Sequence, residues 1–248
     1  MTKDIAITRD KGVVLVTMNR PAKKNALTGA MYDAMTAALS ESASDPTIGT
    51  VVITGSQGVF TAGNDINDFL SHKRGRDGSP GLRFIKALGS FEKPVVAAVD
   101  GLAIGIGTTM LLHCDLVYAS PSARLKVPFV DLGLTPEGGS SVLLPRRCGM
   151  ARASELLLLG EEVSADRARE FGLVNEVVPA DVLLAHALAK ARMLAMKPPK
   201  ALAATRRMLR GDPNELMAVM DQEGHEFAGR LSMPEARAAF SAFMQKSA

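Results

Sequence analysis

The sequence predicts an α/β fold that is followed by a helical C-terminal segment. Short apolar runs with strand character alternate with helical stretches through most of the chain, and two of these runs end at glycine-rich turns. From Asp181 onward the sequence is almost wholly helix-forming. Periodicity does not give the order of the strands, so the sheet topology stays open at this level.

The first predicted element is a β-hairpin. Residues Ile5–Arg9 and Val13–Met18 have strand patterns, and Asp10-Lys11-Gly12 between them forms a glycine-containing turn. The later strands are expected at Thr50–Thr54, Val95–Val99, Leu116–Ala119, Leu125–Val127 and Val174–Val178. Helices are expected at residues 28–44, 81–90, 106–113, 140–148 and 164–171.

The C-terminal segment carries two helix-start signals. Asp212-Pro213 provides an N-cap followed by proline at the first helical position, and Ser232-Met233-Pro234-Glu235 matches a capping box. We therefore divide the chain into a core, residues 1–195, and a helical oligomerisation region, residues 196–248. The apolar faces of this region could be buried against a neighbouring subunit or against the same chain, and the sequence does not decide between them.

Composition excludes several classes of function. The chain has 248 residues and a net charge of +3, and its Lys and Arg residues are scattered rather than clustered as in nucleic-acid binders. Aromatic residues amount to 4%, with no Trp, which argues against base stacking. We find no signal peptide and no membrane-length apolar run, so we expect a cytoplasmic protein. The two Cys residues have no CxxC spacing and are expected to be free, and the four His residues lack metal-ligand spacing.

Two strand-ending turns are candidate binding elements. They read Phe60-Thr61-Ala62-Gly63-Asn64-Asp65-Ile66 and Gly101-Leu102-Ala103-Ile104-Gly105-Ile106-Gly107. Glycines in such turns let backbone N–H groups point outward, and the second turn leads into a helix N-terminus. Each motif alone is equally compatible with tight turns and close helix packing.

Taken together, these residues resemble the crotonase superfamily of enoyl-CoA hydratases and isomerases. The resemblance begins at Asn19-Arg20-Pro21 and Asn25-Ala26-Leu27, continues through FTAGNDI and KPVVAAVDGLAIGIG, and reaches Gly172-Leu173-Val174. It implies a spiral of ββα units with a C-terminal helical trimerisation region, assembled as a homotrimer or hexamer. It also implies an acyl-CoA thioester substrate without a separate cofactor, since CoA is part of the substrate.

The resemblance also implies roles for individual residues. The oxyanion hole falls on the backbone N–H groups of Asn64 and Ile106. Further substrate-binding positions are Ala62, Gly63, Asp65, Ile66 and Gly105, although Asp65 is better explained as a residue that fixes its turn. Lys23 and Lys24 either meet the adenosine and pyrophosphate charges of CoA or are solvated surface lysines. Phe129 and Leu134 are candidates for the apolar lining, although core packing explains them equally.

The acidic residues indicate which reaction the resemblance favours. Family hydratases place two carboxylates where this sequence has Thr109 and Phe129, and neither side chain accepts a proton at neutral pH. The segment VPFVDLGLTPEGGSS instead resembles Δ3,Δ2-enoyl-CoA isomerases of the peroxisomal type, in which its Glu is the catalytic base. Glu137 inherits that role, although an exposed turn acid or helix cap would look the same in isolation. Asp131 is a possible second acid.

The sequence therefore predicts a Δ3,Δ2-enoyl-CoA isomerase that uses Glu137 as a single base. Two alternatives remain open: a hydratase or other crotonase reaction, and a non-catalytic acyl-CoA-binding scaffold. The polar, glycine-rich stretch at residues 71–81 is expected to be a surface loop, with a lid as one possible role.

Overall fold

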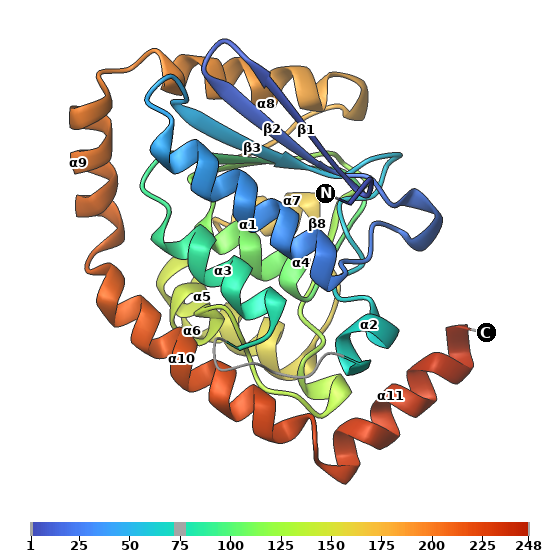
Figure 1. Ribbon diagram of the computed structural model, residues 1–248. Helices are drawn as coiled ribbons and strands as arrows, with labels where there is room; N and C mark the ends of the chain where they lie inside the picture. Colours follow the sequence, from blue (N-terminus) through green and yellow to red (C-terminus); the bar gives the residue numbers. More distant parts are fainter. Residues whose placement is uncertain (1, 72–77, 248) are drawn as a thin grey trace.

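The computed structural model describes residues 2–71 and 78–247 and contains two β-sheets with helices around them (Figure 1). The larger sheet has six strands in the order β1-β2-β3-β4-β6-β9, and the smaller has three in the order β5-β7-β8. The strands are β1 Ile5–Asp10, β2 Val13–Met18, β3 Thr50–Thr54, β4 Val95–Val99, β5 Leu102–Ile104, β6 Leu116–Ala119, β7 Arg124–Lys126, β8 Val163–Ser164 and β9 Glu176–Val177. The α/β prediction is therefore confirmed.

The helices connect these strands and then form the C-terminal segment. The α-helices are α1 Gly29–Ser44, α2 Ile66–Ser71, α3 Pro80–Ser90, α4 Ile106–Thr109, α5 Ser140–Cys148, α6 Met150–Ser154, α7 Ala165–Glu170, α8 Ala180–Ala195, α9 Pro199–Arg210, α10 Pro213–Arg230 and α11 Pro234–Ser247. Shorter turns are the 3-10 helices η1 Pro21–Lys23, η2 Met110–His113 and η3 Val130–Leu132, and the π-helical turn η4 Glu155–Leu159.

The predicted hairpin is present, with a shorter turn than expected. Strands β1 and β2 pair antiparallel, and Asp10 still belongs to β1 because it pairs with Val13. Lys11 and Gly12 alone form the turn, with φ values of 48° and 75°. Two consecutive positive φ values match the twist of a two-residue hairpin.

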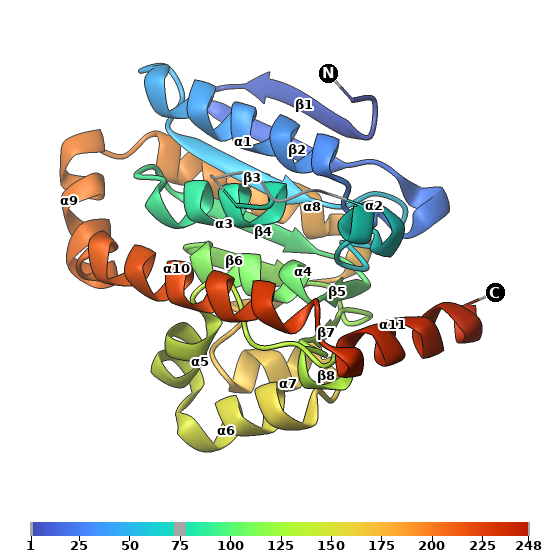
Figure 2. The same cartoon turned by 60° about the horizontal axis from the view of Figure 1, so that its bottom comes forward.

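The middle of the large sheet is parallel and buried on both faces. Strands β2, β3, β4 and β6 run in parallel, and every residue of β3 and β4 is buried. Helix α8 packs on one face against Val52 and Val96, and α1 and α3 cover the other face (Figures 1 and 2). Parallel strands covered on both sides read as continuous apolar runs, which is why β3 and β4 are visible in the sequence.

The C-terminal helices pack on their own chain. Helix α10 contacts α3, α11 contacts η3, and α9–α11 follow one side of the core in Figures 1 and 2. Asp212 accepts a hydrogen bond from the Asn214 N–H, as the N-cap prediction requires. The capping-box prediction was wrong, since the Ser232 hydroxyl donates to the Gly229 carbonyl instead and α11 begins at Pro234.

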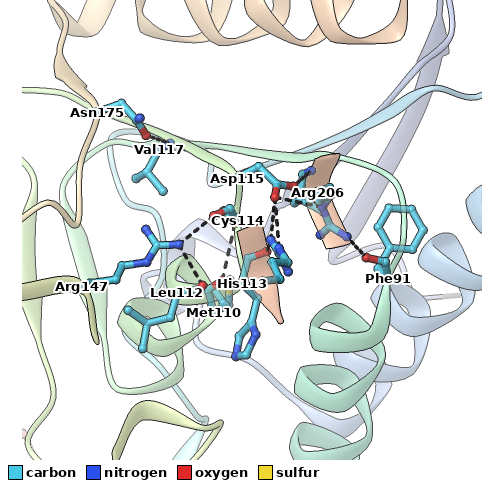
Figure 3. Close-up of polar contacts among 12 residues, drawn as sticks. Phe91, Met110, Leu112, His113, Cys114, Asp115, Val117, Arg147, Asn175 and Arg206 are labelled. Atoms are coloured by element: carbon cyan, nitrogen blue, oxygen red, sulfur yellow. Dashed lines mark hydrogen bonds and ion pairs between the residues drawn. The ribbon is translucent and has the colours of Figure 1, made fainter. Parts of the chain in front are cut away.

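An ion-pair cluster fastens α9 to the core. The Asp115 carboxylate accepts a hydrogen bond from the Val95 N–H and pairs with Arg206 at 2.9 Å and Arg210 at 2.8 Å. Figure 3 shows Arg206 between Asp115 and Phe91, whose carbonyl also accepts from this guanidinium. Asp115 therefore anchors a helix from the C-terminal region, a role that the sequence could not distinguish from local capping.

Three other sequence predictions concern short segments. Cys114 and Cys148 are both free, as expected, but Cys148 is only partly buried. The predicted lid at residues 71–81 includes positions 72–77, which lie outside the described residues. No helix in the described part of the chain has the length and apolarity to cross a membrane.

Candidate active site

The two glycine turns lie side by side at the carboxyl ends of β3 and β4. The Thr61 N–H donates to the Leu102 carbonyl at 2.8 Å, and the Ile104 N–H donates to the Thr61 carbonyl at 3.0 Å. Gly63 allows this approach, because a Cβ there would lie 2.8 Å from the Ile104 carbonyl oxygen and its φ is +88°. The parallel sheet therefore brings together two turns that are distant in the sequence.

Two backbone donors remain without a protein acceptor at this junction. Within residues 2–71 and 78–247, no acceptor is paired with the N–H of Asn64 or with that of Ile106. Ile106 is the first residue of α4, where an N–H has no intrahelical partner, and Gly105 precedes it with a φ of +57°. Both residues line one pocket, so the two donors belong to the same site.

Glu137 lines the same pocket from a third segment. The pocket wall includes Leu27, Gly29, Tyr32, Asn64, Asp68, residues 78–82, Ile106, Glu137, Gly224, Phe227 and Ala228. The predicted catalytic residues Glu137, Asn64 and Ile106 are thus brought together, although they come from three different connections of the chain. The surroundings are largely apolar side chains and backbone.

Burial sets the proton affinity of Glu137. Desolvation raises the pKa of this carboxyl to about 7, the Thr109 hydroxyl that donates to its Oε1 at 2.5 Å lowers it, and the charge of Glu223 raises it. A base of this pKa gains and loses a proton near neutral pH. Thr109 therefore has a direct contact with the candidate base at the position where family hydratases carry a carboxylate.

The turn after Glu137 is held from two sides. Gly138 and Gly139 have φ values of 68° and 77°, as expected for the tight turn before α5. The Gly138 carbonyl accepts a 2.7 Å hydrogen bond from Nε2 of His113. Burial lowers the pKa of His113 to about 3, so the ring is neutral and its proton resides on Nε2. Glu223 from α10 contacts the other side of the turn.

Tyr32 positions the side chain of Asn64. Its hydroxyl donates to Asn64 Oδ1 at 2.6 Å, and its ring lies 5.7 Å from that of Phe84. Burial, together with the charges of Glu137 and Asp68, raises the pKa of Tyr32, so the hydroxyl keeps its proton. The hydrogen bond from Tyr32 therefore fixes the side chain of Asn64, the residue that bears one of the two backbone N–H groups without a protein acceptor.

The Asn64 turn is also fixed by an ion pair. Asp65 accepts from Arg20 Nη1 at 2.7 Å and from the Asp68 N–H at 3.1 Å. Asp68 in turn accepts from the Gly29 N–H at 2.7 Å. These contacts match the interpretation of Asp65 as a turn-fixing residue, and they place a second acid, Asp68, in the pocket wall.

The other predicted substrate-binding residues do not line this pocket. Ala62, Gly63, Asp65, Ile66 and Gly105 belong to the two turns that carry the free N–H groups. Lys23 and Lys24 are exposed beside η1.

Phe129 and Leu134 require a correction. Both are buried in the core, and Phe129 packs edge-on against Phe227 with ring centroids 6.4 Å apart. The apolar wall comes instead from Leu27, Leu82 and Phe227. Asp131, the possible second acid, is exposed and pairs with Lys126.

Several pocket residues were missed from the sequence. Tyr32 and Leu82 lie on α1 and α3, and Phe227 lies on α10, which also brings Glu223 to the turn behind Glu137. Nothing in the local sequence distinguishes them from ordinary helix residues, because only the packing of these helices on the core brings them to the pocket.

Comparison with known proteins gives the family. A family model described as enoyl-CoA hydratase/isomerase matches residues 8–248. The chain belongs to this family. It is 36% identical to 2,3-dehydroadipyl-CoA hydratase of Escherichia coli over 98% of this chain and 96% of that protein. It is also 36% identical to enoyl-CoA delta isomerase 2 of Rattus norvegicus, over 90% of this chain and 58% of that protein.

A solved structure agrees with this assignment. The enoyl-CoA hydratase/isomerase of Pseudoalteromonas atlantica superimposes with a TM-score of 0.94, is 41% identical, and covers 98% of each chain. The protein is therefore an acyl-CoA enzyme with the crotonase fold, and the resemblance stated from the sequence was right.

Proposed function

We propose that this family member is a Δ3,Δ2-enoyl-CoA isomerase that moves a double bond into conjugation with the thioester. The observation that carries this proposal is the pairing of one partly buried acid, Glu137, with two residues on the same pocket whose backbone N–H groups have no protein acceptor in the described chain, while position 109 is threonine. Isomerisation needs one base that can return its proton, whereas hydration in this family uses two carboxylates. The similarity to enoyl-CoA delta isomerase 2 supports the same reading.

The proposed reaction is a proton shuttle. The Glu137 carboxylate takes a proton from C2 of a 3-enoyl-CoA, and the electron pair of the broken C–H bond enters the dienolate. The same carboxyl group then gives the proton to C4, which leaves the double bond between C2 and C3. A pKa of about 7 suits this role, because the ideal pKa of a general base lies near the operating pH.

The free N–H groups would stabilise the intermediate. As the C2 proton leaves, negative charge moves onto the thioester oxygen, and the N–H groups of Asn64 and Ile106 would donate to it. One such donor commonly contributes about 2.7–4 kcal/mol to transition-state stabilisation. Because these are backbone groups, the side chain at Ile106 is free to serve packing.

A hydratase is the second candidate, and a specific observation supports it. The chain is similar along its length to 2,3-dehydroadipyl-CoA hydratase. Asp68 also lines the pocket, so a second carboxylate is available there in place of the exposed Asp131. In that reaction the two acids would activate and orient a water molecule.

Two substrates separate these functions. Purified protein is incubated with a 3-enoyl-CoA and, separately, with the matching 2-enoyl-CoA, and absorbance together with chromatography follows each product. Conversion of the first without hydration of the second supports the isomerase, and the reverse result supports the hydratase. Binding of both without turnover would leave the non-catalytic acyl-CoA-binding scaffold. The predicted homotrimer or hexamer stays a prediction, which sedimentation equilibrium of the same preparation tests.

A further inference from the structure

A carboxylate from the C-terminal region holds the turn that carries Glu137. Glu223 lies on α10 and is buried, with 8% of its surface exposed. It accepts hydrogen bonds from the Gly139 N–H at 2.5 Å, the Ser141 N–H at 3.0 Å and the Ser141 hydroxyl at 2.5 Å. Gly139 and Glu223 are 84 positions apart in the chain, so these contacts exist only because α10 folds back onto its own core.

The contacts replace a missing helix cap. Helix α5 begins at Ser140 after Gly139, and glycine has no side chain to accept the first helical N–H groups. Glu223 accepts them from a different helix. The packing around it is close, since a Cβ on Gly139 would lie 2.7 Å from Cδ1 of Leu216 on α10. Besides the local bonds from Ser140 to the Glu137 carbonyl, the backbone that follows Glu137 is thus fixed by α10.

No cation neutralises this carboxylate. Over the parts of the chain that the structure describes, no Lys, Arg or His side chain forms an ion pair with Glu223, which accepts from two backbone N–H groups and one hydroxyl. The Asp115 carboxylate, by contrast, pairs with two arginines. The Glu223 carboxylate is satisfied by neutral donors at the start of α5, on the turn that follows the candidate base.

We propose that Glu223 is a positioning residue for proton transfer, which holds the Glu137–Ser141 turn from α10. This inference rests on the proposed role of Glu137. It assigns to the C-terminal region, residues 196–248, a part in catalysis within the same chain, in addition to the predicted oligomerisation. Helix α10 also supplies Gly224 and Phe227 to the pocket wall, so the base and the acyl site would be aligned by one element.

Several polar and titratable groups surround Glu137. Tyr32 from α1 and Asp68 from α2 line the pocket with it, and the Thr109 hydroxyl from α4 donates to it. Glu223 approaches from α10, and the neutral ring of His113 supports the turn through Gly138. The charge of Glu223 raises the pKa of Glu137, and the Thr109 hydroxyl lowers it. Removal of the Glu223 charge should therefore lower the pKa of Glu137 and shift the activity profile to lower pH.

The test compares Glu223→Gln with Glu226→Gln, an exposed acid one turn further along α10 that pairs with Arg230. For Glu223→Gln we expect kcat for the 3-enoyl-CoA to fall about 10- to 100-fold, since misplacement of a catalytic group by about 1 Å costs up to roughly 100-fold. KM should stay within about twofold, because α10 itself remains docked and substrate affinity depends on the pocket wall. The rising limb of the pH–rate profile should move to lower pH. Glu226→Gln should match the wild type in all three.

A second measurement does not depend on turnover. The carboxyl carbon of Glu137 is followed by 13C NMR during a pH titration, and its resonance is assigned by its loss in Glu137→Gln. A lower midpoint in Glu223→Gln than in the wild type supports the proposal even if the reaction proves to be hydration. Failure of the wild type to isomerise a 3-enoyl-CoA would contradict only the proposed function.

Two milder variants cover the case in which Glu223→Gln does not fold. Glu223→Asp keeps the charge but shortens the reach, and Ser141→Ala removes one of the three donors. Both should lower kcat by a few-fold while leaving the pH limb in place. A folded Glu223→Gln with wild-type kcat and an unchanged Glu137 titration overturns the proposal. So does an unfolded Glu223→Gln accompanied by wild-type kcat in both milder variants.

Discussion

The C-terminal helices are fastened to the core at two acidic anchors that differ in their partners. At the first, the core residue Asp115 pairs with Arg206 and Arg210 of α9. At the second, Glu223 of α10 accepts from backbone N–H groups and a hydroxyl of the catalytic turn. The first anchor joins one carboxylate to two guanidinium groups and does not line the pocket, whereas the charge of the second raises the pKa of Glu137.

Two acidic contacts that dock the same C-terminal region can therefore have different consequences. The Asp115 cluster lies away from the pocket wall, and its ion pairs stabilise the docking of α9. A carboxylate that is satisfied by neutral donors keeps its field, and in a poorly solvated region that field shifts the pKa of a neighbour. We therefore expect changes at the Asp115 anchor to affect stability and changes around the Glu137 turn to affect rate and pH dependence.

The largest effect is expected from Glu137→Gln. Loss of a general base should lower kcat by about 10²–10⁴-fold, measured with a 3-enoyl-CoA at pH 8. The exposed acid in the same segment, Asp131, provides the control Asp131→Asn, which should keep wild-type activity. Substantial residual turnover in Glu137→Gln would remove Glu137 from the mechanism.

Glu137→Gln should also change the stability of the protein. Because the pKa of Glu137 is raised from 4.5 to about 7 on folding, the folded state holds a proton that the unfolded state has lost, and wild-type stability falls as pH rises through this window. Glu137→Gln lacks this penalty and should be more stable than the wild type by about 1–3 kcal/mol above pH 7. Denaturant unfolding at pH 5 and pH 8 measures the difference, which should be small at pH 5.

A substitution at the Asp115 anchor should lower stability and leave kcat nearly unchanged. Asp115→Asn keeps an acceptor for the Val95 N–H but leaves Arg206 without its opposite charge, so we expect a loss of about 2–4 kcal/mol in the free energy of unfolding. The kcat of the folded enzyme should stay within about twofold. Asp10→Asn, which breaks the exposed pair with Arg192, should change stability by less than about 1 kcal/mol. If Asp115→Asn lowered kcat without lowering the free energy of unfolding, the proposed difference between the two anchors would be wrong.

A smaller shift is expected from Thr109→Val. The substitution removes the hydroxyl that donates to Glu137, so the pKa of the base should rise and the rising limb of the pH–rate profile should move up by about one pH unit. Thr109→Ser keeps the hydroxyl and should keep the wild-type limb. Coincident profiles for all three proteins would show that this contact does not tune the base.

The smallest effect is expected from substitution of Lys23 and Lys24, which lie outside both anchors. If Lys23 and Lys24 meet the charged groups of CoA, the double change to Ala should raise KM by about 2- to 5-fold at low salt and leave kcat unchanged, since exposed charge contacts contribute about 0.2–1 kcal/mol each. The difference should shrink at high ionic strength. An unchanged KM at low salt would identify them as solvated surface lysines.

Much of the fold could be predicted because its signals are local. The buried parallel strands at Thr50–Thr54 and Val95–Val99 show as apolar runs, and the two glycine turns follow directly from them. The short strands β5 and β8 were missed, since Leu102–Ile104 lies inside the second glycine turn and Val163–Ser164 has only two residues. Phe129 and Leu134 were candidates for the lining, with core packing as the alternative, because a buried apolar residue looks the same in a core and in a pocket wall.

By itself, the sequence predicted the α/β fold from the alternation of strands and helices, and its motifs carried the family resemblance, which in turn implied the roles of Asn64, Ile106 and Glu137. Only the tertiary structure decided what surrounds them. Tyr32, Phe227 and Glu223 reach the site through helix packing across long stretches of chain, and the proton affinity of Glu137 depends on the burial and charge that this packing creates. Desolvation and through-space charge are properties of the folded neighbourhood, so no local pattern of residues can specify them.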